Sequence, residues 1–239
     1  MTEQRYLENP NMSECQSIVL RASQDERGEY VVFRESIFYP QGGGQPADQG
    51  CFTWKNGQAK IKDVRNMEGE IRHYCVFDSD NPSEGQEVSM VLDADRRELN
   101  TRYHTAGHLI AAVVPKCFSQ LIAVKGHQFP GEAYVKFDGT IVDDIATMQA
   151  QVQEAINVAV AKDHVVKTEA MNHEQAEALL KDLPYDLPVH KEHRVCTIDA
   201  CGAAPCGGTH VSRLGEIGAI QVKQMKCKKG QTSVSYSII

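Results

Sequence analysis

The sequence predicts an α+β protein in which a small β-barrel domain precedes a mixed helix-and-sheet domain. Three observations predict this fold class. Short runs rich in Val, Ile, Phe and Tyr, separated by turn residues, occupy the first 92 residues. A helical repeat of apolar residues begins directly after Asp93, and strand-like runs return later in the chain. We therefore expect two domains, at residues 1–92 and 93–239.

The first domain contains five strand-like runs and one clear hairpin signal. Asn56-Gly57 follows Trp54-Lys55, and Asn-Gly suits the tight turn between two antiparallel strands. The runs expected to form strands are residues 17–20, 30–33, 59–64, 71–77 and 88–92.

The second domain is expected to begin with a helix over residues 93–114, capped by Asp93 and ended by Pro115. A second helix is expected over 143–163, and a short third helix after Asn172, where Gln175 completes a capping box. The apolar faces of the two long helices are Leu99, Tyr103, Ala106, Ile110 and Val113 for the first, and Ile145, Met148, Val152, Ile156 and Ala159 for the second. Strands are expected at 133–137, 194–198, 217–225 and 232–238, the last two joined by a turn at Lys228–Gln231.

Composition excludes several classes of protein. Hydrophobic residues make up 41% of the 239 residues and charged residues 24%, which disfavours disorder, collagen and coiled coil. No apolar run has the ~18 residues of a membrane span, and the N-terminus has no secretory signal pattern. Eight cysteines without such a signal suit reduced thiols, some of them candidate metal ligands, better than disulfides. We expect a cytoplasmic enzyme or binding protein.

The charge is acidic over the whole chain but basic at its C-terminal end. A net charge of −7 argues against a protein that coats DNA. The basic excess after residue 210 comes mostly from Lys223, Lys226, Lys228 and Lys229. These lysines either hold a polyanion locally or protect the solvated edge of a hairpin, and charge alone favours the second interpretation.

Two pairs of metal-ligating residues stand out. His104 and His108 are four residues apart on an expected helix, so both imidazoles project from one face. Thr105 stands where an H-E-x-x-H protease has its catalytic Glu, which disfavours a zinc protease. Cys206 and His210 have the same spacing around two glycines, which indicates a tight turn. Together they offer four zinc ligands, and the spacing leaves open whether the site is structural or catalytic.

The remaining cysteines and histidines are not expected to bind metal or take part in chemistry. Cys201 is the one plausible extra ligand, and we interpret it as a small buried hydrophobe with the rest: Cys15, Cys51, Cys75, Cys117, Cys196 and Cys227. The histidines expected at the surface are His73, His164, His190 and His193.

A third motif is the glycine-rich segment 38–48, Phe-Tyr-Pro-Gln-Gly-Gly-Gly-Gln-Pro-Ala-Asp. The backbone at Gly42, Gly43 and Gly44 can approach a ligand closely, and its amides can bind an anion or a carbonyl. No dinucleotide or P-loop pattern surrounds it, so a nucleotide site is unsupported. The alternative is a flexible turn with aromatic flanks.

The three motifs, in this order, resemble the alanyl-tRNA synthetase editing domain. A chain of this length resembles the free-standing alanyl-tRNA editing proteins, and the similarity runs from about Phe38 to the C-terminus and includes 125–131 and 215–218. One departure is Ser233, which stands at or near a position where the family often carries Arg before its last Tyr. That puts one contact with the tRNA backbone in doubt, and neighbouring lysines could compensate.

The resemblance implies a zinc-dependent hydrolase that deacylates mischarged tRNA(Ala), carrying serine or glycine. It implies zinc on His104, His108, Cys206 and His210. Our candidates for contact with a serine hydroxyl are Thr105, Gln41 and the Gly42–Gly44 backbone. The alternative for Thr105 is that it packs against the preceding helical turn and bonds its own backbone. The candidates for tRNA contact are Lys226, Lys228 and Lys229. No DNA or membrane partner is expected.

Three alternatives stay open at this point. The threonyl-tRNA editing domain has a similar pair of metal motifs, although the glycine-rich loop and the N-terminal β domain favour the alanine system. A non-catalytic, zinc-stabilised RNA-binding module is a second alternative, and a zinc hydrolase of small amides or peptides is a third.

Overall fold

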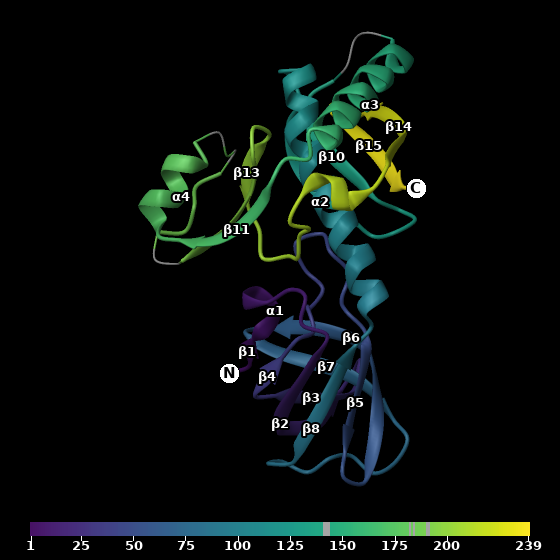
Figure 1. The fold of residues 1–239 in the computed structure, drawn as a ribbon, viewed down its shortest axis with the longest axis vertical. Coiled ribbons are helices and arrows are strands. Elements are labelled where there is room, and N and C mark those ends of the chain that lie inside the picture. The colour runs from purple at the N-terminus through teal and green to yellow at the C-terminus, as the bar shows by residue number, and fades with distance from the viewer. Residues whose placement is uncertain (141–143, 182, 184, 190–191) are drawn as a thin grey trace. The chain divides into compact units, whose positions relative to one another are not determined.

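The computed structural model describes residues 1–140, 144–181, 183, 185–189 and 192–239 (Figure 1). It contains two compact units, Met1–Leu99 and Asn100–Ile239. The mixture of helices and sheets is as predicted, and the N-terminal barrel is confirmed as a closed barrel. The division between the units falls inside helix α2 (Ala94–Cys117), a few residues after the domain boundary that we placed at 92/93.

The first unit is built around six strands that close in the order β2-β3-β7-β6-β5-β8. Each of the five runs predicted as strands lies inside one of them, and the Asn56-Gly57 signal marks the β5–β6 hairpin. A two-residue strand β1 (Glu3–Gln4), a single-turn helix α1 (Arg5–Glu8) and β4 (Glu35–Ser36) were not predicted. The barrel strands are β2 (Glu14–Asp25), β3 (Gly28–Phe33), β5 (Gly50–Trp54), β6 (Gly57–Met67), β7 (Glu70–Phe77) and β8 (Glu87–Leu92).

A buried histidine lies within the barrel, where the sequence placed a surface residue. His73 on β7 is fully buried, so the expectation that it is exposed was wrong. Its side chain is satisfied internally: Nδ1 lies 3.0 Å from the Val31 carbonyl oxygen and Nε2 lies 2.7 Å from Ser36 Oγ. These bonds let a polar ring occupy the apolar interior, and burial lowers the pKa of His73 to about 4.

The glycine-rich segment is fixed at its far end by a buried ion pair. Asp48 is fully buried, accepts a hydrogen bond from the Tyr39 backbone N–H at 2.6 Å, and pairs with Arg97. Arg97 also donates to the backbone oxygens of Pro10 and Ile37, each at 2.6 Å. An arginine in the first turns of α2 thus holds three separate segments of the first unit.

The apolar face of α2 packs into the core of the second unit from Tyr103 onwards. Leu99 is 39% exposed, so the prediction that it belongs to the buried face was wrong. It precedes Tyr103, the first residue of the helix in that core. Asp93 Oδ1 accepts from Arg96 N at 3.0 Å, as a helix cap does. The helix also passes Pro115 and ends at Cys117, against prediction. A proline removes one backbone donor, and Val113 and Val114 keep this last turn in the core.

Two sheets accompany α2 in the second unit. The four-stranded sheet has the order β14-β15-β10-β9, and the three-stranded sheet has the order β11-β12-β13. The run 217–225 was only partly strand, because residues 214–217 form a 3-10 helix, η1 (Leu214–Ile217). The β14–β15 turn has positive φ at Lys229 and Gly230, which suits a two-residue hairpin loop. The strands are β9 (Ile122–His127), β10 (Tyr134–Asp138), β11 (Val166–Met171), β12 (His193–Ile198), β13 (Gly202–Pro205), β14 (Ile220–Lys228) and β15 (Gln231–Ile238), of which β9, β11 and β13 were not predicted.

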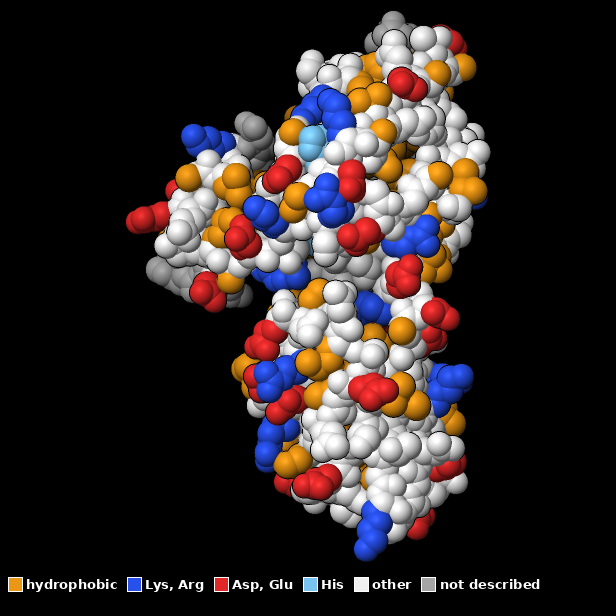
Figure 2. Space-filling view, viewed as in Figure 1, with side chains coloured by type: hydrophobic (Ala, Val, Ile, Leu, Met, Phe, Trp, Pro, Cys, Tyr) orange, Lys and Arg blue, Asp and Glu red, His pale blue; other side chains and the backbone are white. Residues whose placement is uncertain are grey.

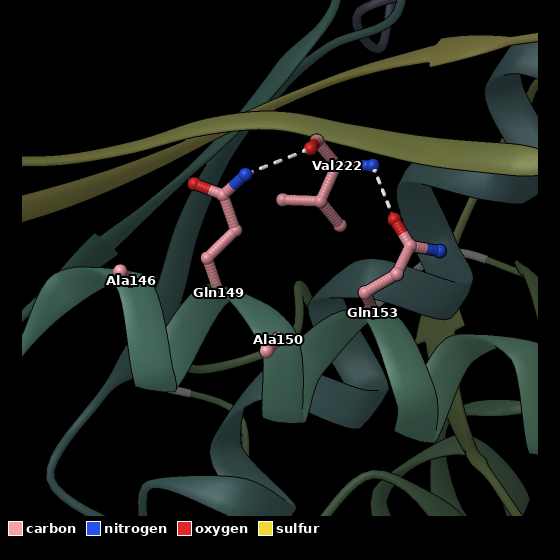
Figure 3. Close-up of a pocket in the computed structure, with 5 residues that line it drawn as sticks. All are labelled: Ala146, Gln149, Ala150, Gln153 and Val222. Atoms are coloured by element: carbon pink, nitrogen blue, oxygen red, sulfur yellow. Dashed lines mark hydrogen bonds between the residues drawn. The ribbon is translucent and has the colours of Figure 1, made fainter.

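Helix α3 (Ile145–Ala161) covers the outer edge of β14. Figure 3 shows Gln149 and Gln153 reaching from the helix to Val222, where the strand carries a bulge. Gln149 Nε2 donates to the Val222 oxygen at 3.1 Å, and Gln153 Oε1 accepts from the Val222 N–H at 2.8 Å. These glutamines satisfy backbone groups that an edge strand leaves unpaired.

The helix predictions in this unit are largely confirmed. Asp144 caps α3, and the buried face is the predicted one except for Ile145, which is 41% exposed in the first turn. The predicted start at residue 143 lies outside the described residues. Helix α4 (His173–Leu179) has the predicted capping box between Asn172 and Gln175.

Because His73 is buried and uncharged, we expect the stability of the barrel to fall in acid. Its pKa in the folded chain lies below the ordinary value of 6.5, so the unfolded chain binds the proton more readily, and stability falls as the pH drops from 6.5 towards 4. The loss expected over that window is about 3 kcal/mol. Denaturant unfolding followed by Trp54, the one tryptophan and a barrel residue, measures it.

The control is His73→Gln, which can still bond both neighbours but does not titrate. We expect its free energy of unfolding to change less than that of the wild type between pH 6.5 and 4. Parallel pH profiles for the two chains would contradict the account.

Candidate metal centre

The two pairs of ligand residues come together in the second unit. His104 and His108 lie one turn apart on α2, Cys206 directly follows β13, and His210 lies between Cys206 and η1. One ligand atom from each of the four lies within 4.8 Å of the others. Segments about 100 residues apart in the chain therefore build one cluster, as the sequence predicted.

The ligand atoms face one another at close range. Cys206 Sγ lies 3.4 Å from His104 Nε2 and 3.2 Å from His210 Nε2. The His108 ring centroid lies 5.0 Å from that of His104 and 4.7 Å from that of His210. Bonds of 2.0–2.3 Å from a tetrahedral zinc ion place neighbouring ligand atoms about 3.3–3.8 Å apart. The donor set suits zinc, and the two separations from Cys206 Sγ lie close to that range.

The turn that carries Cys206 is held by an arginine that the sequence analysis did not single out. Arg194 on β12 donates to the Cys206 oxygen at 2.9 Å and to the Gly208 oxygen at 2.6 Å. Its own carbonyl accepts from the Cys206 N–H at 2.8 Å, which continues the β12–β13 pairing. An arginine in a strand gives no local signal of such a role. A Cβ at Gly207 would meet open space, so close packing does not require glycine at that position.

Burial sets the protonation of the cluster. It lowers the pKa of His104 and His210 well below 6.5 and that of His108 to about 4, so all three imidazoles are neutral near pH 7. Burial also raises the pKa of the Cys206 thiol to about 11. Neutral imidazoles are the form that binds metal, and the thiol needs a bound cation to become a thiolate. No carboxylate belongs to this cluster within the described residues.

Thr105 contacts His210 at Nδ1, the ring nitrogen that does not face Cys206. Its Oγ1 donates to the Thr101 oxygen at 3.0 Å, accepts from the Val211 N–H at 3.2 Å, and lies 3.2 Å from His210 Nδ1. Because the hydroxyl proton is used on Thr101, His210 must donate from Nδ1, which leaves its Nε2 lone pair for a metal. The predicted contact of Thr105 with a substrate hydroxyl stays a prediction, and it would have to replace one of these bonds.

The glycine-rich loop belongs to the first unit. Gln41, Gly42 and Gly43 are exposed, and Gly44 is half-buried. The loop is tight, with a bridge between Gly42 and Gln45 and positive φ at Gly43 and Gly44. The Tyr39 hydroxyl donates to the Gly42 oxygen at 3.0 Å, so an aromatic flank braces the turn.

The other predicted residues are also located. Lys226 and Lys228 lie on β14 and Lys229 in the hairpin turn, and all three are exposed. All eight cysteines are free, and Cys201 is not part of the cluster. Cys196 is buried, as expected, while Cys15, Cys51, Cys75, Cys117, Cys201 and Cys227 are partly buried.

Among the remaining histidines, the expectation that His193 lies at the surface was wrong. His193 is only 8% exposed, because it lies in β12 with Nε2 3.1 Å from the Pro188 oxygen. His164 is partly exposed, and His190 lies outside the described residues.

Comparisons with known proteins also find a similarity to tRNA synthetases. Residues 11–96 match the family model of class II (A) tRNA synthetases, and residues 193–234 match that of the threonyl and alanyl tRNA synthetase second additional domain. The chain is 32% identical over 225 residues to an alanine–tRNA ligase of Methanopyrus kandleri, covering 92% of this chain and 24% of the ligase. It is 29% identical over 222 residues to the alanyl-tRNA editing protein AlaX-L of Pyrococcus horikoshii, covering 93% of this chain and 54% of that protein.

The resemblance to alanyl-tRNA editing proteins is therefore confirmed. The chain spans about a quarter of the ligases' length and about half that of AlaX-L. Among the described residues, no helix is both long and apolar enough to cross a membrane.

We predict one zinc ion per chain. Replacing His104 and Cys206 together by Ala should abolish zinc retention, because it removes two of four ligands. Metal analysis of freshly purified protein measures the content. The matched control is Cys201→Ser, a nearby thiol outside the cluster, which should keep its zinc. Full zinc content in the double variant would contradict the assignment.

Proposed function

We propose that this chain is a zinc-dependent hydrolase that deacylates mischarged tRNA(Ala), above all Ser-tRNA(Ala). The observation that carries the proposal is the cluster of His104, His108, Cys206 and His210 in a chain that resembles alanyl-tRNA editing proteins. An aminoacyl ester is already activated, so its hydrolysis needs mainly orientation and stabilisation of developing charge.

The cluster supplies the chemistry through residues that are held in place. A zinc ion, when bound, would act as a Lewis acid on the ester carbonyl or on a water molecule. The Thr105 hydroxyl keeps His210 in the tautomer that presents Nε2, and Arg194 keeps Cys206 in its turn. His108 is only partly buried, so the cluster is accessible on that side. In the part of the chain that the structure describes, the cluster includes no carboxylate that could act as a base, and we infer that water and the terminal ribose hydroxyls take part in proton transfer.

Selection for serine needs polar groups that alanine would leave unpaired. A synthetase pocket built for alanine rejects serine weakly, because serine adds only one hydroxyl, and smaller glycine also enters. We propose that Gln41 and the amides of Gly42, Gly43 and Gly44, which belong to the first unit, bind polar groups of the substrate. The exposed, braced turn of this loop supports the assignment, since its backbone is accessible and its shape is fixed. Cognate alanine would leave these groups without a partner, which disfavours its binding.

The hairpin lysines suit contact with the tRNA. Lys226, Lys228 and Lys229 are exposed, and Glu216 is the one acid in residues 211–239. They can neutralise phosphates without base recognition. Ser233 lies directly opposite Lys226 in the β14–β15 pairing, so a lysine flanks the position where the family often has Arg.

A panel of aminoacyl esters tests the proposal. We expect the wild-type chain to hydrolyse Ser-tRNA(Ala) much faster than Ala-tRNA(Ala), and His104→Ala to lose most of this activity. The loss over time of acid-precipitable radiolabelled amino acid from the tRNA measures the rate. Faster hydrolysis of Ser-tRNA(Thr) would favour the threonine system, and activity on peptides alone would favour an amide hydrolase. Tight tRNA binding without hydrolysis of any ester would indicate a non-catalytic module.

Thr105→Val separates two roles of that hydroxyl. If Thr105 positions His210, the variant should bind zinc about 10–100-fold more weakly, and saturating zinc should restore activity on serine and glycine esters alike. Competition with a zinc chelator measures the affinity. Thr101→Val is the control, because it removes a hydroxyl of the same helix that bonds Thr209 and not a ligand. Unchanged zinc affinity with a loss on serine esters alone would instead show contact with the substrate.

A further inference from the structure

The outer face of the four-stranded sheet carries a row of lysines that crosses its strands. Strand register places Lys226 opposite Ser233, Ser233 opposite Lys136, and Lys136 opposite Lys125. Paired residues of antiparallel strands point to the same face of a sheet. The alternate residues on these strands, such as Val135 and Phe137, lie in the core, so the lysine row lies on the opposite face. Lys125 and Lys226 are exposed there, and Lys136 is partly exposed.

Protection of a sheet edge does not explain this row. Lys226 and Lys125 lie on the two outer strands, where lysines commonly discourage edge-to-edge pairing. Lys136 lies on the inner strand β10, directly opposite Lys125. Two like charges in directly opposed positions destabilise a sheet, so their presence calls for an anionic partner.

Next to the lysine row, three aromatic rings form a column. The rings of His127 and Phe129 are stacked at 4.2 Å and 5°, and those of His127 and Tyr134 at 5.2 Å and 29°. Lys136 Nζ lies 5.6 Å from the Tyr134 ring centroid, which joins the column to the lysine row. Phe129 ends the column and is partly exposed. Such a ring can stack on an unpaired base.

Few acids oppose these cations. Asp138 lies at the end of the face and accepts from Gln231 Nε2 at 2.7 Å, and Glu132 Oε1 lies 3.6 Å from His127 Nε2. The visible side of the molecule in Figure 2 shows cationic and anionic side chains interspersed.

We propose that this sheet face is an RNA-binding surface. The lysines at 125, 136 and 226 bind successive phosphates of one strand, and the Phe129 end of the aromatic column stacks on an unpaired base. Strands lie about 4.8 Å apart, so the row spans roughly 14 Å, which is enough for two or three phosphates of an extended strand. The choice of RNA rests on the proposed function, and tRNA with its unpaired 3′ end is the RNA in question.

Binding of uncharged tRNA(Ala) tests the lysine row without any need for hydrolysis. We expect Lys125→Gln/Lys136→Gln to lower the slope of log affinity against log salt by about 1.4, and the affinity at 0.1 M salt about 20-fold. Fluorescence anisotropy with an end-labelled transcript and the full chain measures both. The matched control is Lys60→Gln/Lys62→Gln, which removes two exposed lysines from β6 of the barrel. An unchanged slope in the first variant, or an equal loss in the control, would overturn the proposal.

Phe129→Leu tests the aromatic column. Loss of one stacking contact should weaken binding of the same transcript about fivefold or more and leave the salt slope unchanged. Retained zinc content shows that the variant is folded. Unchanged affinity would remove the base-stacking part of the proposal. Because no arm uses hydrolysis, loss of tRNA binding in these variants supports the surface even if the chain proves inactive on every ester.

Discussion

The convergence of four ligand side chains on one point is the constraint on which the second unit depends. Cys206 and His104 are 102 residues apart in the chain, yet their ligand atoms lie 3.4 Å from each other. Helix periodicity places His104 and His108 on one face of α2, and β13 delivers the turn that carries Cys206 and His210. The core that surrounds α2 holds these elements in register, so the apolar packing and the candidate metal centre require the same arrangement.

Burial keeps the side chains of the cluster in their uncharged forms as long as no cation is bound. Three imidazoles are kept neutral because a charge would be poorly solvated there, and the Cys206 thiol is kept protonated for the same reason. A metal ion that bound would remove the thiol proton and compensate the resulting charge, so metal affinity and folding stability are linked. The Thr105 and Arg194 contacts fix the orientation of ligands that burial alone would leave free to rotate.

The sequence predicted what depends on local pattern and missed what depends on tertiary partners. Five of the six barrel strands, the capping box at Asn172 and the two ligand pairs follow from local pattern, and the structure contains them. The burial of His73 did not follow, because its partners Ser36 and Val31 come from other segments of the barrel. Arg194 was missed for the same reason. The passage of α2 beyond Pro115 shows core packing outweighing a helix-ending residue.

The proposed ester hydrolysis depends on metal bound by this cluster. The most direct measurement strips the chain with a chelator and titrates zinc back while following Ser-tRNA(Ala) hydrolysis. We expect the stripped chain to be inactive and its activity to rise linearly to a plateau at one zinc ion per chain. Full activity in the stripped chain, with no response to added zinc, would contradict it.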